Sequence, residues 1–160
     1  MPKPDLRVIY DMLEPVIEAE GMELYDLEFL TEYGRRILRI YIDKEQGHIS
    51  LDDCEKINYA VEPVLDADDF IPFAYVLEVS SPGVERKLVK DRHYYANMGK
   101  LAEVRTVKPP FTEGSYKNNK KFRGVLTDVD TEFLVIKDNG YDLRFERKNV
   151  AYCRLIYTED

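Results

Sequence analysis

The pattern of the sequence changes near residue 99, and this change limits the folds that the chain can adopt. Before that point helical and strand-like patterns alternate over long segments, and after it only short strands and turns follow. The 160 residues suffice for one ordinary domain or two small ones. We therefore predict an N-terminal α/β domain over residues 1–83, a connecting segment with a short helix over 84–99, and a β domain over 100–160.

The first part begins with a helix and a hairpin. Apolar residues recur at helical spacing over 5–20, which predicts an amphipathic helix. Strict alternation over 24–30, and again over 36–42, predicts two strands. Tyr33-Gly34 lies between them, and Gly can adopt the positive φ that a tight hairpin turn requires.

A second helix and a third strand complete this part. Ser50 can cap the helix, and Asp53 three residues later completes an arrangement that resembles a capping box. An apolar stripe then continues to Leu65, and residues 73–80 are rich in strand formers. The expected fold is α+β, with two helices on one face of a three-stranded sheet.

The last part consists of short strands. Asp91 could cap a short helix that ends near Gly99. The five candidate strands lie at 101–107, 121–128, 132–137, 141–146 and 151–157. Because so few short strands cannot bury both faces of an open sheet, we predict a small closed barrel.

Charge is distributed unevenly along the chain. Residues 1–95 contain 11 Lys/Arg and 21 Asp/Glu, a formal charge of −10, and residues 96–160 contain 12 and 10, a charge of +2. An acidic half repels phosphate backbones and attracts basic surfaces such as those of ribosomal proteins, although acidity also simply keeps a domain soluble.

The acidic residues around the second helix have the same two interpretations. They are Asp43, Glu45, Asp52, Asp53, Asp66, Asp68 and Asp69. No calcium-loop motif is present and no histidine accompanies them, so the sequence predicts no metal site there. Docking of a basic protein and plain solvation both remain open.

Signals for other classes of protein are missing from the sequence. No apolar stretch approaches the ~20 residues that span a bilayer, and the first residues do not resemble a secretion signal, so we expect a cytoplasmic protein. Cys54 and Cys153 are expected to be reduced, buried thiols. His48 and His93 are isolated, and the phosphate-loop, nucleophile-elbow and dinucleotide motifs are absent, so no catalytic residue, metal or cofactor is predicted.

One run carries a family resemblance. Tyr75-Val-Leu-Glu-Val-Ser-Ser-Pro-Gly83, followed by Val84-Glu85-Arg86, is similar to the signature of the ribosome maturation factor RimP. Features on both sides of the run occur in the same order as in that family, and the resemblance covers nearly the whole chain. The sequence departs from the family at Lys87, where a proline is usual.

The resemblance implies a fold and a role. It implies that the β domain is an SH3-like, Sm-related barrel. It also implies a monomeric, non-enzymatic factor without a cofactor that binds the free small ribosomal subunit. There it would help a ribosomal protein and the surrounding ribosomal RNA to settle near the decoding region.

Two groups of residues are candidate binding sites. The first is the turn after the third strand, where Pro82 fixes φ, Gly83 allows close approach and Arg86 can bind phosphate or carboxylate. This group comprises Ser81, Pro82, Gly83, Glu85 and Arg86. The same turn could instead be an internal hinge that orients the two domains.

The second group is basic and belongs to the barrel part. It comprises Lys117, Lys120, Lys121 and Arg123. Lysine and arginine neutralise phosphates, and we expect these residues to contact RNA, although they could also form a solvated loop. Tyr116 and Phe122 lie among them and could stack on bases, but strand alternation favours Phe122 in the core.

Two other functions remain open. A freestanding Sm-like regulator would bind RNA as an oligomeric ring, and a stable ring in solution would distinguish it from a monomeric assembly factor. A hydrolase with an acidic site would need turnover that depends on a divalent metal ion, which we do not expect.

Overall fold

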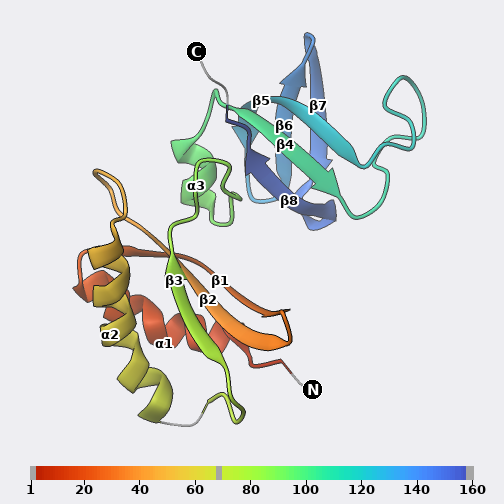
Figure 1. Ribbon diagram of the computed structural model, residues 1–160. Coiled ribbons are helices and arrows are strands. Elements are labelled where there is room, and N and C mark those ends of the chain that lie inside the picture. Colours follow the sequence, from red (N-terminus) through yellow and green to blue (C-terminus); the bar gives the residue numbers. More distant parts are fainter. Residues whose placement is uncertain (1–2, 68–69, 158–160) are drawn as a thin grey trace. The chain divides into compact units, whose positions relative to one another are not determined.

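The chain divides into two compact units, residues 1–82 and 83–160. A computed structural model describes residues 3–67 and 70–157 (Figure 1). Residues 1–82 contain 7 Lys/Arg and 19 Asp/Glu, a formal charge of −12, and residues 83–160 contain 16 and 12, a charge of +4. The difference in charge between the two units is therefore larger than the difference found between residues 1–95 and 96–160. Among the described residues, no helix has the length and apolarity needed to cross a membrane.

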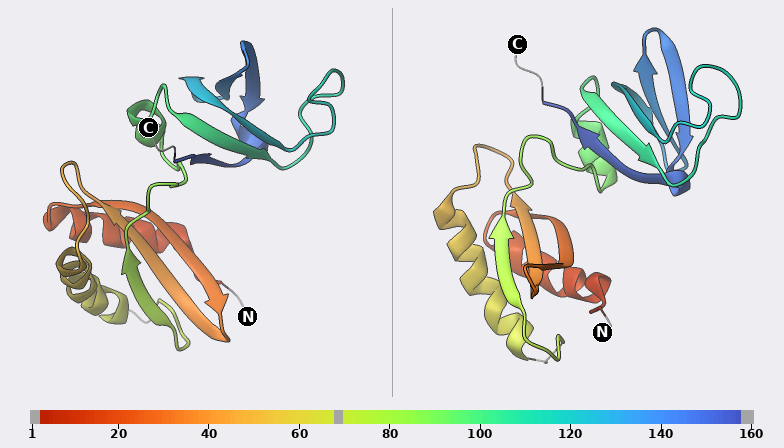
Figure 2. Two further views of the ribbon diagram at one scale, coloured as in Figure 1. Left: turned by 45° about the horizontal axis from the view of Figure 1, so that its top comes forward. Right: turned by 45° about the vertical axis from the view of Figure 1, so that its right-hand side comes forward.

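The first unit contains two helices and three strands. Its elements are α1 (Leu6–Ala19), β1 (Glu23–Glu32), β2 (Arg35–Asp43), α2 (Leu51–Ala67) and β3 (Val76–Ser80). The strand order is β1-β2-β3, with β1 antiparallel and β3 parallel to β2. Both helices cover one face of this sheet, which confirms the predicted arrangement (Figures 1 and 2).

Local sequence signals explain these elements. Tyr33 and Gly34 have φ of 53° and 75°, as a two-residue hairpin turn requires. Ser50 and Asp53 form the reciprocal capping pair: the Ser50 amide donates to Asp53 Oδ2 at 2.9 Å, and the Asp53 amide donates to Ser50 Oγ at 3.1 Å. The beginning of α2 was therefore predicted correctly.

The core of the first unit lies between the sheet and the helices. It is formed by Ile9, Leu13 and Ile17 of α1, by Ile57, Val61 and Leu65 of α2, and by Leu38, Ile40 and Ile42 of β2. The helical residues are spaced by four and the strand residues by two, so each element presents one continuous apolar surface. The opposite face carries Glu28, Arg39 and Glu78 beside an apolar row of Leu30, Ile37 and Val76.

The second unit is a curled antiparallel sheet with one short helix. Its elements are α3 (Asp91–Ala96), β4 (Leu101–Thr106), β5 (Lys121–Val129), β6 (Phe133–Asp138), β7 (Tyr141–Glu146), a 3₁₀ turn (Arg147–Asn149) and β8 (Val150–Leu155). The strand order is β7-β6-β5-β4-β8, so the last strand returns beside the first. This arrangement fits a barrel-like fold whose inner face holds a second core.

Both ends of α3 differ from the prediction. Asp91 does not cap α3, because the buried His93 accepts hydrogen bonds at Nδ1 from the amides of Lys90 (3.0 Å) and Val89 (3.2 Å) and fills that role. Asp91 forms an ion pair with Arg147 at 2.8 Å instead. The helix also ends at Ala96, before Gly99.

The third strand is shorter than predicted. It begins at Val76 rather than at residue 73, because the parallel pairing with β2 begins at Ile37 opposite Val76. Phe73 packs at the end of the sheet, with its ring 5.7 Å from that of Phe29 and 4.4 Å from the Arg36 guanidinium carbon.

An aromatic cluster packs the long loop between β4 and β5 against the second core. The Phe111 ring lies 5.6 Å from that of Phe122 and 5.8 Å from that of Phe145, and the Tyr116 hydroxyl donates to Asp138 Oδ2 at 2.8 Å. Phe122 is buried, as strand alternation predicted. Tyr116 is partly buried, so neither ring is presented to solvent as a stacking platform.

Candidate binding surfaces

The turn after β3 is exposed and leads directly into the second unit. Gly83 has a φ of 82°, a conformation that favours glycine, and Ser81 and Glu85 are exposed. Arg86 closes the turn, because its Nε donates to the Gly83 carbonyl at 2.9 Å. Pro82 is partly buried at the end of the first unit.

The residues after this turn pair with β8. The Leu155 amide donates to the Arg86 carbonyl at 3.0 Å, and the Leu88 amide donates to the Cys153 carbonyl at 2.7 Å. Lys87 forms an isolated antiparallel bridge with Arg154. Glu85 accepts from the Tyr157 amide at 3.2 Å. The beginning of the predicted connecting segment is thus held as a short edge of the second sheet.

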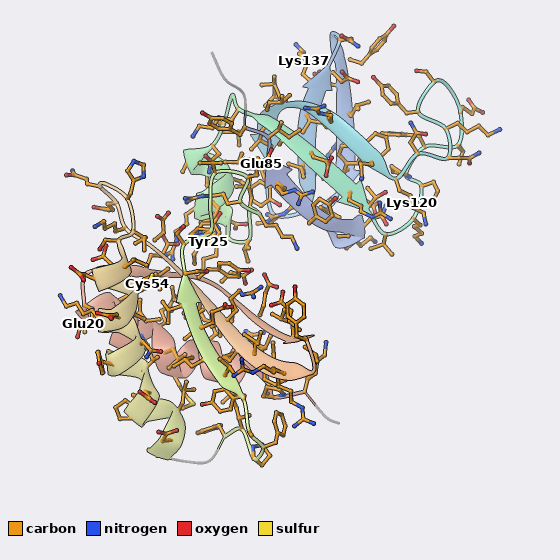
Figure 3. All side chains as sticks on the ribbon, in the orientation of Figure 1. Glu20, Tyr25, Cys54, Glu85, Lys120 and Lys137 are labelled. Carbon is orange, nitrogen blue, oxygen red and sulfur yellow. The ribbon has the colours of Figure 1, made fainter. Side chains whose placement is uncertain are left out.

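The basic residues predicted from the sequence lie in two places. Lys120, Lys121 and Arg123 lie together at the beginning of β5, and all three are exposed. Lys117 is also exposed but belongs to the loop that precedes them. Figure 3 shows Lys120 and Lys137 at opposite ends of the second unit's sheet.

The strand register adds a residue that the sequence analysis missed. Arg105 of β4 lies directly opposite Lys121, and both side chains are exposed. Like charges directly opposite each other lower the stability of a sheet. The stability of the fold therefore gives no reason for this pair. Among the described residues, none forms an ion pair with Arg105, Lys121 or Arg123. We call the surface formed by Arg105, Lys120, Lys121 and Arg123 the outer basic face.

A neighbouring carboxylate, Glu103, interacts with Lys121 of this face but is hydrogen-bonded to β8. Glu103 is opposite Arg123 in the register, but its Oε2 accepts from the Tyr152 hydroxyl at 2.9 Å and from Arg154 at 3.1 Å. Burial opposes ionisation of Glu103, yet these two hydrogen bonds keep its pKa below the ordinary value. The Glu103 charge is therefore already engaged with β8.

The outer basic face continues across β8 to the edge segment. Tyr152 is opposite Arg105, and its ring lies 5.0 Å from the Arg154 guanidinium carbon and 5.5 Å from the Lys87 ammonium. Sequence analysis missed Lys87, Tyr152 and Arg154 because they are far from β5 in the chain.

Several acidic residues of the first unit form ion pairs, unlike the cations of the outer basic face. Asp53 binds the Ser50 amide and the Lys44 ammonium (2.9 Å), and these interactions lower its pKa to about 2. Asp43, Glu45, Asp52 and Asp66 lie near the same helix, whereas Asp68 and Asp69 lie outside the described residues. Over residues 3–67 and 70–157, no group of three or more acidic, histidine or cysteine side chains could hold a metal ion.

An ionic network on the open sheet face was not predicted. Register places Glu28, Arg39 and Glu78 in one row across the three strands. Arg39 binds Glu78 through Nε and Glu32 through a terminal nitrogen at 3.0 Å. One arginine therefore faces three carboxylates, and the face remains acidic.

The chain thus combines an acidic α+β unit with a β unit that exposes a basic face. Residues 12–85 match the model of the RimP N-terminal domain, which includes the entire run first noted in the sequence. This match confirms the resemblance to the RimP family of ribosome maturation factors over a little under half of the chain. The match supports a RimP-type role in ribosome maturation, and it implies a ribosome-related partner.

Proposed function

We propose that this protein binds the free small ribosomal subunit and assists its late folding and the incorporation of a ribosomal protein. The main observation in support of this proposal is the outer basic face. Three cations without an ion-pair partner, two of them directly opposite each other, suit a surface that neutralises RNA phosphates.

The first unit would contact a basic ribosomal protein near the decoding region. Its formal charge is −12, and its open sheet face carries Glu28, Glu32 and Glu78 around Arg39. Complementary charge accelerates encounter and orients docking. The negative charge also keeps this unit away from RNA, which the basic unit would contact.

The exposed turn at residues 81–86 would provide a further contact with the subunit. Glu85 and Arg86 are held by hydrogen bonds within the second unit, whereas Ser81 and Gly83 are exposed beside them. In our proposal this turn contacts the subunit with backbone and hydroxyl groups, and its two charged side chains keep its shape.

The mechanism proposed is selective binding. The protein acts in the cytoplasm as a monomer, holds an immature conformation of the subunit, and leaves when the mature surface no longer fits. Binding of this kind assists maturation only if the affinity for the immature state is higher, because equal affinity shifts no equilibrium.

Co-sedimentation tests the proposal. The purified chain should sediment with free small subunits and not with whole ribosomes. The Lys121→Glu/Arg123→Glu variant should remain in the supernatant, whereas Arg7→Glu, a charge reversal at an exposed arginine of α1, should sediment normally. Equal recovery with both particles, or recovery with neither, would contradict the proposal.

A further inference from the structure

The second unit contains a pocket separate from the outer basic face. Its walls are the beginning of the loop after β4 on one side and β7 with the 3₁₀ turn on the other, and Phe133 of β6 lies between them. Its volume is about 670 Å³, within the usual range of ligand-binding pockets. Its lining includes Lys108, Phe133, Arg144, Lys148 and Asn149.

The pocket is built before any ligand arrives. Asn149 Oδ1 accepts from the Lys108 amide at 3.1 Å, and Asn149 Nδ2 donates to the Lys108 carbonyl at 3.0 Å. The Val107 amide also donates to the Asn149 carbonyl at 2.8 Å. These three hydrogen bonds join the two walls, and Pro109 and Pro110 restrict the backbone that follows. A ligand would therefore encounter little loss of loop entropy on binding.

A layered pair of side chains lies within the pocket. The Arg144 guanidinium carbon is 3.7 Å from the centre of the Phe133 ring, which is a stacking distance. Arg144 is exposed and Phe133 is partly buried, so the guanidinium is the outer layer. Among the described residues, none forms an ion pair with Arg144. A planar guanidinium fixed on a ring is a platform on which an unpaired base can stack.

The charge around the platform suits an anion. Lys108, Arg144 and Lys148 are positive and Glu146 is the one carboxylate in the lining, which gives a local charge of +2. Lys148 lies 3.5 Å from Glu146, but both side chains are largely exposed, so this pair is weak. Phosphate groups on either side of a stacked base could therefore reach cations on both walls.

We infer that this pocket binds an unpaired nucleotide of single-stranded RNA, with its base on Arg144 and its phosphates near Lys108 and Lys148. The inference deepens the proposed function, and it rests on that function for the identification of the RNA as ribosomal. A double helix does not satisfy the site, because its bases are stacked on each other and closed to a side-chain platform. The pocket thus selects RNA that has not yet formed its final pairing.

Fluorescence anisotropy with a labelled RNA of ten uridines and the full chain tests this inference. Arg144→Lys keeps the charge and removes the planar group, and it should weaken binding by roughly tenfold, the low end of what one stacked base contributes. Phe133→Leu removes the support of the guanidinium and should act in the same direction. Arg35→Lys in the first unit is the matched control and should leave the affinity unchanged.

Unchanged affinity in Arg144→Lys, or equal binding of the wild type to a duplex of the same length, would overturn the pocket as a single-strand site. Because Arg144 is exposed, this variant should retain the wild-type fold, and thermal unfolding would verify that Phe133→Leu does too. If uridine binding depends on Arg144 but the chain does not sediment with small subunits, the pocket stands and the proposed function fails. If the chain sediments normally but binding ignores Arg144, the pocket fails and the proposed function stands.

Discussion

The two units of this protein treat their charged residues in opposite ways. In the first unit, Arg39 is shared between Glu32 and Glu78, and Lys44 binds Asp53. In the second, Arg105 and Lys121 face each other without a partner carboxylate. Paired charges stabilise the fold that holds them, whereas unpaired like charges in register are maintained at a cost to it. In our proposal, the second unit therefore supplies the nucleic-acid surface.

The largest expected effect is a substitution that destabilises the second unit and leaves the first unit folded. Gly124 has no room for a side chain, because a Cβ there would lie 2.7 Å from the Lys137 carbonyl oxygen. Gly124→Val should therefore destabilise the second unit by about 3 kcal/mol or more. Hydrogen exchange should show lost protection in β4–β8 and normal protection in α1 and α2.

Gly34→Ala is the corresponding glycine substitution in the first unit, for comparison with Gly124→Val. Nothing lies within 4 Å of its added Cβ, but its φ of 75° is strained for alanine, so a loss of about 1–2 kcal/mol is expected there. Loss of protection throughout the chain in Gly124→Val would contradict the independence of the units.

The second effect concerns RNA affinity. Lys121→Glu/Arg123→Glu reverses two uncompensated charges and should reduce affinity for ribosomal RNA by roughly tenfold or more at physiological salt. A plot of log affinity against log salt should become shallower by about 1.4 to 1.8, the contribution of two phosphate contacts. Filter binding over a salt series measures both quantities. An unchanged slope would show that these side chains do not meet phosphates.

The third effect tests whether the paired charges of the first unit are structural. Arg39→Met should lower its free energy of unfolding by about 1 kcal/mol, because the two carboxylates that lose their partner are nearly half exposed and can be hydrated. Urea unfolding measures this loss. RNA affinity should not fall, and a fall would mean that Arg39 belongs to the nucleic-acid surface.

The smallest effect is a pH dependence. The pKa of Asp53 is about 2, below its ordinary value of 3.8, so its ionised form stabilises the fold above pH 4. This stabilisation is lost as the pH falls from about 4 to 2. Asp53→Asn lacks it, so the difference in melting temperature between wild type and variant should shrink over that interval. If the difference in melting temperature stayed constant over this interval, Asp53 would not be the source of the pH dependence.

Much of the fold could be predicted from local signals. The hairpin at Tyr33-Gly34, the cap at Ser50 and the strand at 141–146 depend on residues close in sequence, and the structure has each where it was expected. The cap of α3 was not predicted, because the accepting group is His93 inside the helix rather than a side chain at its first residue.

The site was predicted only in part for the same reason. Lys121 and Arg123 are neighbours in the chain, whereas their relation to Arg105 depends on strand register. The pocket around Phe133 and Arg144 is completed by the beginning of a loop at Lys108 that no local pattern connects to them.

The most direct measurement is ultraviolet crosslinking of the purified protein to free small subunits, followed by identification of the crosslinked peptides. The account predicts RNA crosslinks in peptides of the second unit that contain residues 103–123 or 133–154, and none in the strands of the first unit. RNA crosslinks confined to the first unit, or a complete lack of them in a complex that forms, would contradict it.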